Sequence, residues 1–183
     1  MNCKYTATDK TTKTIHPKYL SREASTATFA IDIDDKVYAW GLSSIVKAAA
    51  DLLKPTSLST ILSNNLGSLA GKTVTEVITG YQSSVALASD KTLHVWGDST
   101  SGQLGQGNTN SQPNPVQFNL GAIAGKNVIT ATGSKGSFTI AVDDQGLAYS
   151  AFVVFFFSPF FSFHALLIYF FIFFFAFSIF KVV

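Results

Sequence analysis

The sequence of 183 residues has a single cysteine, Cys3, and three histidines that lie far apart in the chain. One cysteine excludes a disulfide within the chain and any multi-cysteine zinc site. The histidines (His16, His94 and His164) have no spacing typical of metal ligands, so we predict no metal site.

A strong excess of charge of either sign is also missing. The chain has 13 Lys and Arg residues against 11 Asp and Glu residues, which gives a net charge of +2. This balance excludes a polybasic arm for nucleic acid and a like-charged disordered tail. Residues 1–19 contain no apolar run, so no secretory signal is indicated and we expect a cytoplasmic or nuclear protein.

Hydrophobic residues are concentrated at the C-terminus. Residues 151–183 hold 14 of the 17 phenylalanines, whereas the preceding part has the composition of a polar, turn-rich domain. We therefore predict an N-terminal segment 1–25, a repeat domain 26–150 and a Phe-rich hydrophobic tail 151–183.

An internal repeat organises the middle of the chain. Residues 29–41 match residues 85–97 at an offset of 56 throughout. Residues 138–150 match the second copy at an offset of 53 before an Asp-containing turn and 55 after it, which predicts a longer turn in the third copy. A second block, 66–74, recurs as 120–128 at an offset of 54.

Each copy has the pattern of a β-hairpin. Phe29, Ile31 and Ile33 alternate with smaller or polar residues, and this period of two is typical of a strand with one buried face. A turn follows, then a short strand that ends at Trp40 or Trp96.

Further strands, 74–78 and 128–131, precede two of the hairpins. Gly80 and Gly133 suit tight links in a left-handed conformation. Several strands per unit of about 54 residues predict an all-β propeller, with a solenoid as the lesser alternative.

The second copy continues with a specific motif. Trp96-Gly97 is followed by Gly-Gln-Leu-Gly-Gln-Gly over 102–107 and then by Pro113 and Pro115. This resembles the repeat of the regulator of chromosome condensation family, and the resemblance covers about residues 26 to 150. It implies a propeller with seven four-stranded blades in complete members. Known members include an exchange factor for the small GTPase Ran and many propellers that only bind proteins.

Two departures from that pattern limit the resemblance. After Trp40-Gly41 the first copy has an apolar stretch in which Ile45, Ala49 and Leu52 predict a short helix ending before Pro55. The third copy has 151–152, Ala-Phe, where Trp-Gly is due. We therefore predict a partial propeller, a fragment of a larger ring with exposed blade edges.

The hydrophobic tail has three open interpretations. Residues 160–180 are long enough for a transmembrane helix of about 31 Å, with Lys181 able to reach the interface. Alternatively, the T-rich codons shared by its residues indicate read-through of an unspliced intron. The third interpretation is a buried strand of the fold.

Several short motifs are better explained by structure than by chemistry. Gly-Gln-Leu-Gly-Gln-Gly has the reverse of the dinucleotide spacing, and 133–137 lacks the spacing of a phosphate loop. Residues 44–47 fit Ser-x-x-Lys without its companion motifs. We assign Asp32, Asp34, Asp35, Asp143 and Asp144 to turns, His94 to a partly buried strand position, and both tryptophans to blade packing.

We therefore predict no catalytic, cofactor-binding or metal-binding residue. The predicted function is that of a non-catalytic module for protein–protein interaction through loops on one face of the ring. The alternatives are a guanine nucleotide exchange factor for a Ran-type small GTPase, and an interaction module anchored in a membrane through 160–180. Nucleic acid is not an indicated partner.

Overall fold

A computed structural model gives the fold. It describes residues 3–6, 12–21, 27–41, 52–80, 82–119, 121–133, 138–151 and 180–182.

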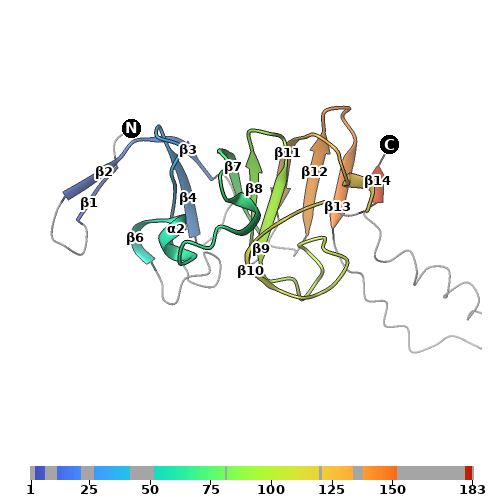
Figure 1. The fold of residues 1–183 in the computed structure, drawn as a ribbon, viewed down its shortest axis with the longest axis horizontal. Coiled ribbons are helices and arrows are strands. Elements are labelled where there is room, and N and C mark those ends of the chain that lie inside the picture. The colour runs from blue at the N-terminus through green and yellow to red at the C-terminus, as the bar shows by residue number, and fades with distance from the viewer. Residues whose placement is uncertain are drawn as a thin grey trace, which may run out of the picture.

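Three four-stranded antiparallel sheets stand side by side in Figure 1. The strands of each sheet follow one another in chain order. The first sheet contains β3 (Pro17–Leu20), β4 (Ala27–Asp32), β5 (Val37–Gly41) and β6 (Leu52–Ser57). The second contains β7 (Val74–Thr79), β8 (Ser83–Ala88), β9 (Leu93–Gly97) and β10 (Gln112–Gln117). The third contains β11 (Val128–Gly133), β12 (Thr139–Asp143), β13 (Ala148–Ala151) and β14 (Phe180–Val182).

These sheets confirm the all-β class and the four-stranded units predicted from the repeat. The first sheet takes its first strand, β3, from the predicted N-terminal segment, and the third takes its last strand, β14, from the predicted tail.

Short helices connect one sheet with the next. α2 (Leu58–Ile61) follows β6 and is capped by the Ser57 hydroxyl, which accepts a hydrogen bond from the Thr60 N–H. The 3₁₀ turns η1 (Gly67–Leu69) and η2 (Gly121–Ile123) precede β7 and β11, and they lie in the two copies of the second repeated block.

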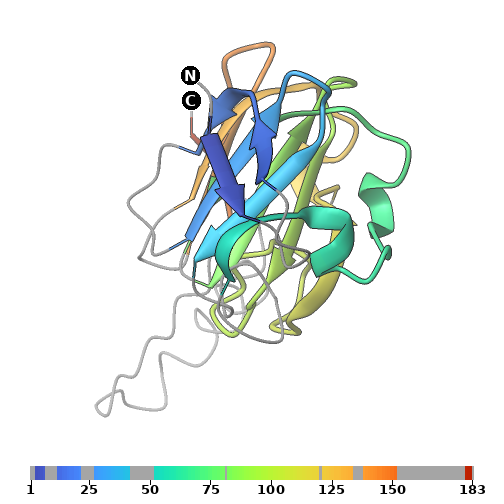
Figure 2. The same cartoon turned by 90° about the vertical axis from the view of Figure 1, so that its left-hand side faces the viewer.

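A separate hairpin of β1 (Cys3–Thr6) and β2 (Thr12–Ile15) precedes the first sheet. Figure 2 shows it in front of that sheet, on the side away from the second sheet. Ile15 is buried, and the Lys54 ammonium of β6 donates a hydrogen bond to the Thr6 carbonyl at 3.0 Å.

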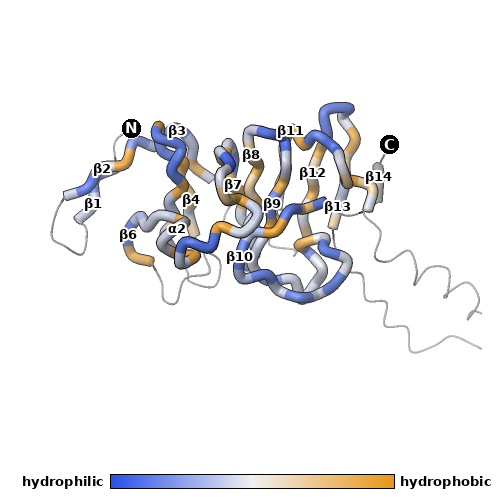
Figure 3. The backbone as a smooth tube through the Cα atoms, viewed as in Figure 1, coloured by the Kyte–Doolittle hydropathy of each residue, from blue (hydrophilic) through white to orange (hydrophobic). Residues whose placement is uncertain are grey.

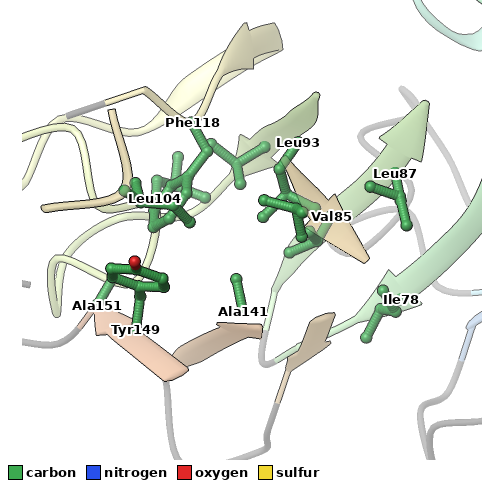
Figure 4. Close-up of a cluster of buried hydrophobic side chains, with 12 residues drawn as sticks. Ile78, Val85, Leu87, Leu93, Leu104, Phe118, Ala141, Tyr149 and Ala151 are labelled. Atoms are coloured by element: carbon green, nitrogen blue, oxygen red, sulfur yellow. The ribbon is translucent and has the colours of Figure 1, made fainter. Parts of the chain in front are cut away.

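Each gap between neighbouring sheets is filled by an apolar core. Phe29, Ile31 and Ala39 of the first sheet pack with Val77 and Trp96 of the second. A second cluster joins the second and third sheets, and Figure 4 shows its side chains converging from both. Figure 3 shows the hydrophobic residues along the strands and hydrophilic residues at the turns. Both faces of β8 are buried, because the second sheet lies between the first and the third.

The register corrects the predicted alignment of the third copy. Ala88 bonds to Thr92 across its turn, and Asp143 bonds to Leu147 in the same way, so the two turns have equal length. The equivalent of Val85 is therefore Ile140 and not Phe138, and the offset is 55 on both strands. The offset of 53 aligns Asp90 with Asp143, but these two residues occupy different positions in their turns.

Ile33 and the predicted helix after Gly41 also differ from expectation. β4 ends at Asp32, and Ile33 lies in the turn with 62% of its surface exposed. Leu52 begins the strand β6, which pairs with β5, because cross-strand hydrogen bonding outweighs local helix propensity there. The remainder of the predicted helix, 42–51, lies outside the described residues.

Gly133 does not adopt the left-handed conformation that we predicted for it. A Cβ at this position would lie 3.1 Å from the Gly80 Cα, so the glycine permits close approach of the two sheets.

Among the residues that the structure describes, no helix has the length and hydrophobicity of a membrane span. The candidate span 160–180 lies outside those residues except for Phe180, which begins β14 beside β13 instead of ending a helix.

Candidate interaction surface

Among the connections within a sheet that the structure describes from end to end, the longest is the loop of residues 98–111 between β9 and β10, which we call the β9–β10 loop. In Figure 1 it lies at the lower end of the sheets, whereas the β12–β13 turn lies at the upper end. The two ends of the stack therefore present different segments and can be compared as binding surfaces.

Gly97 starts this loop and explains the Trp-Gly motif. Its φ of 112° is a conformation that side chains disfavour, and Gly41 in the first sheet has nearly the same value, 115°. A Cβ on Gly97 would lie 2.5 Å from the carbonyl oxygen of Gln82. The motif thus ends one strand where the chain passes tightly against the start of β8.

Three further glycines turn the loop, as the sequence predicted. Gly102, Gly105 and Gly107 have φ values of 69°, 60° and 70°. The Gly102 N–H donates to the Ser99 carbonyl, and the Gly105 N–H donates to the Gly102 carbonyl. The repeated glycines of this motif are therefore conformational residues.

The Asp98 carboxylate organises the inside of the loop. It accepts hydrogen bonds from the Gln103 amide at 2.8 Å, from the Thr100 hydroxyl at 2.7 Å and from the Ser111 hydroxyl at 3.2 Å. Burial opposes ionisation of Asp98, but these hydrogen bonds outweigh it and hold the pKa of the carboxyl below its ordinary value. One charged group thus joins both ends of the loop.

The middle of the loop is attached to the third sheet. The Gln103 carbonyl accepts a hydrogen bond from the Thr139 hydroxyl of β12 at 2.9 Å. Leu104 is fully buried, and Figure 4 shows it beside Phe118 and above Tyr149. Gln103 and Leu104 of the repeat motif therefore fasten one blade to the next.

Replacing Leu104 with alanine is expected to lower the free energy of unfolding by about 2.5 kcal/mol, because it leaves a cavity between two sheets. Chemical denaturation of the full chain measures this loss. Substitution of the exposed Leu53 with alanine is the matched control, and its 93% exposure predicts a change within about 0.5 kcal/mol. Equal losses in the two variants would contradict the assigned role of Leu104.

The outward side of the loop is polar and uncharged. Asp98 is the only charged residue between positions 98 and 119, and its oxygens are engaged inside the loop. The exposed residues of the loop are hydroxyl, amide and glycine residues, namely Thr100, Gly107, Thr109, Asn110 and Ser111. This composition favours contacts through hydrogen bonds.

The opposite end of the stack carries charges of both signs. Lys18 pairs with Asp35 in the first sheet, and Lys72 pairs with Asp90 in the second. These exposed pairs largely neutralise one another, and such pairs stabilise proteins only weakly. The two ends thus differ in kind: mixed charge at the hairpin turns, neutral polar groups at the β9–β10 loop.

Two of the five aspartates assigned to turns, Asp32 and Asp143, form side-chain hydrogen bonds to the backbone of their turns. Asp143 is fully buried and accepts bonds from the Gln145 and Leu147 N–H groups and from the Tyr149 hydroxyl. Burial opposes its ionisation, yet these donors keep the pKa of Asp143 below its ordinary value. Asp32 accepts from the Ile33 N–H in the equivalent turn. Turn chemistry therefore accounts for both carboxylates.

The two tryptophans occupy equivalent strand positions but different environments. Trp40 is paired with Thr28 across the first sheet, and Trp96 is paired with Ser84 across the second. Trp96 is fully buried and meets the Phe29 ring edge-on, with ring centroids 6.2 Å apart. Trp40 is only half-buried, because no described four-stranded sheet lies on its side. The predicted packing role is confirmed for Trp96.

These features define the class of the protein. Four-stranded antiparallel sheets recur at 55 or 56 residues, stack through apolar cores and exchange loop contacts, which is the construction of a β-propeller.

Comparison with known proteins identifies the repeat. The model of the "Regulator of chromosome condensation (RCC1) repeat" matches residues 90–140, and a second RCC1 repeat model matches residues 74–103. The E3 ubiquitin-protein ligase HERC2 of Homo sapiens is 30% identical over 128 residues, and so is that of Mus musculus. Residues 74–140 of the chain therefore contain repeats of the RCC1 type.

Solved structures support the same fold. Human WBSCR16 is 19% identical with a TM-score of 0.56, over 73% of this chain and 33% of that one. Yeast RCC1 (Prp20), solved bound to Kap60, is 21% identical with a TM-score of 0.56, over 74% of this chain and 32% of that one. The matched regions are 66% of this chain but 2% of HERC2, so the chain spans a small part of its relatives.

Proposed function

We propose that this chain is a non-catalytic protein-binding module that contacts its partner through the β9–β10 loop. The observation that carries the proposal is the internal fixation of the loop. Asp98 joins its two ends, and Gln103 and Leu104 attach its middle to the third sheet.

Such fixation favours binding because little conformational freedom is lost on association. Thr109 and Asn110 lie on the exposed side and take no part in anchoring through Asp98. Contacts at polar interfaces depend on hydrogen bonds and bridging water, which hydroxyl and amide groups provide. The surface is therefore suited to a folded protein partner with complementary polar groups.

The solved relatives suggest which partner to test first. One structure of Saccharomyces cerevisiae Prp20p is described together with its binding properties to Gsp1p and histones. We propose a small GTPase of the Gsp1p type as the first candidate. Exchange-factor activity toward such a GTPase is the alternative function, and the similarity to Prp20p is the observation that favours it.

The test measures binding of purified Gsp1p to the full chain by interferometry. A variant carrying both Thr109→Lys and Asn110→Lys is expected to bind at least tenfold more weakly, because two charges enter a neutral contact surface. Gln145→Lys, an exposed position in the β12–β13 turn, is the matched control and is expected to bind like the unmodified chain.

Three outcomes distinguish the alternatives. Loss of binding in the control but not in the loop variant would show that the partner binds the end of the stack that carries the β12–β13 turn. No binding of Gsp1p by the unmodified chain would remove this partner. Release of a fluorescent nucleotide from Gsp1p, if accelerated by the chain, would replace the binding-module proposal with the exchange-factor alternative.

A further inference from the structure

His94 lies in the centre of a hydrogen-bonded chain that the binding surface does not use. The residue belongs to β9 and is fully buried. Its ring nitrogen Nδ1 lies 2.7 Å from the Ser68 hydroxyl of η1, and Nε2 lies 2.8 Å from the Thr92 hydroxyl. Both nitrogens of a buried ring thus have a partner in another segment.

The direction of these hydrogen bonds follows from their last member. The Thr92 hydroxyl donates to the Asp90 carboxylate at 2.6 Å, so its oxygen must accept from His94 Nε2–H. In the neutral ring Nδ1 then carries no proton and accepts from the Ser68 hydroxyl. The hydrogen-bonding pattern therefore selects, for the neutral ring, the tautomer with its proton on Nε2.

This arrangement fastens η1 to the second sheet. Ser68 provides the polar contact, and Leu69 is buried in the core between the first and second sheets. Gly67 lies so close to β10 that an added Cβ would be 2.2 Å from the Pro115 carbonyl oxygen. η1 is thus held between the middle of the sheet and its outer strand, which leads out of the β9–β10 loop.

The surroundings offer the protonated ring little support. Lys72 and Asp90 are the charged groups that act on His94, and they are already paired with each other. From β10 the residue opposite His94 is the neutral Gln117, and from β8 it is Ala86. The facing strands of the first sheet contribute apolar side chains to the core shared with Ala86, namely Phe29, Ile31 and Ala39.

We infer that His94 is an acid-sensitive latch, which holds η1 and β10 in place while the ring is neutral and releases them when it is protonated. Protonation would add a positive charge to a buried site beside Lys72 and would force the Ser68 hydroxyl to reverse its role from donor to acceptor. This inference is independent of the partner that the β9–β10 loop binds.

The pH range follows from the pKa of the ring. Burial, with a smaller contribution from Lys72, lowers the pKa of His94 from 6.5 to about 4. Well above pH 6.5 the ring is neutral in both the folded and the unfolded chain, so the stability from this site is complete. As the pH falls from 6.5 toward 4, the unfolded chain takes up the proton first, and the folding equilibrium shifts on the order of a hundredfold toward the unfolded state.

The experiment follows the titration of His94 by NMR in the full chain labelled on histidine, together with amide exchange at Leu69 and Lys72. We expect the ring to titrate well below pH 6 and the exchange, corrected for intrinsic rates, to accelerate over the same range. A His94 ring that titrates near pH 6.5 would overturn the proposal, and this readout needs no variant that folds.

Variants test the energetic part. His94→Gln retains a donor and an acceptor but cannot be protonated, so the shift in unfolding equilibrium between pH 6.5 and 4 should shrink from about a hundredfold to a few-fold. His16→Gln, at an exposed position, is the matched control and should keep the full shift. An unchanged shift in His94→Gln would also refute the latch.

Discussion

The Gly97→Ala variant is expected to lose about 3 kcal/mol or more of its free energy of unfolding. A non-glycine residue held at a φ of 112° costs about 1 to 3 kcal/mol in backbone strain. The added Cβ would also lie 2.5 Å from the Gln82 carbonyl oxygen and 2.7 Å from the Ser83 Cα. Both atoms belong to the backbone at the start of β8, so relief of the overlap requires movement of a buried strand.

Urea denaturation of the full chain, followed by far-ultraviolet circular dichroism, measures this loss. Gly125→Ala is the matched control, because Gly125 has a positive φ of 70° but no atom within 4 Å of its added Cβ. We expect a loss of about 1 to 2 kcal/mol for that variant, from the left-handed backbone conformation alone. If the two variants lost the same amount, the Trp-Gly motif would be explained by conformation alone and not by close approach.

Those features that repeat in sequence and need only local contacts could be predicted. The hairpins follow from the period-two pattern of apolar residues. The glycine turns follow from backbone conformations with positive φ, which glycine adopts most easily. Both requirements are local to one copy of the repeat. The turn assignment of Asp143 is of the same kind, because its carboxylate oxygens accept hydrogen bonds from groups no more than six residues away. Such local patterns are sufficient to predict the all-β class.

Contacts between sheets could not be predicted in this way. The bond from Thr139 to Gln103 joins residues 36 positions apart, and neither residue type indicates the other. Leu52 at the start of β6 fits the pattern of a helix end, but the segment forms a strand because it hydrogen-bonds to the edge of β5. His94 was assigned to a partly buried strand position, whereas it is fully buried, because the contribution of Ser68 from a preceding turn is not visible in β9.

Trp96→Ala is expected to lower the free energy of unfolding by about 4 kcal/mol, since a fully buried ring between two sheets is removed. The substitution also removes the edge-on contact with Phe29, and aromatic pairs of this kind contribute about 1 kcal/mol to stability. Trp40→Ala, at the equivalent strand position, is expected to cost about half as much because Trp40 is half-buried. Thermal and urea denaturation of both variants measure the difference, and equal losses would show that burial in the first sheet matches that in the second.

A third variant separates packing from hydrogen bonding at this position. The Trp96 indole N–H is buried and has no hydrogen-bond partner among the residues that the structure describes. Trp96→Phe keeps an aromatic ring and removes that unsatisfied donor, whose burial costs about 1 to 3 kcal/mol. We therefore expect Trp96→Phe to lose much less than Trp96→Ala, about 1 kcal/mol, because the lost ring volume and the removed donor act in opposite directions. A loss as large as that of the alanine variant would mean that the indole N–H forms a strong hydrogen bond in solution.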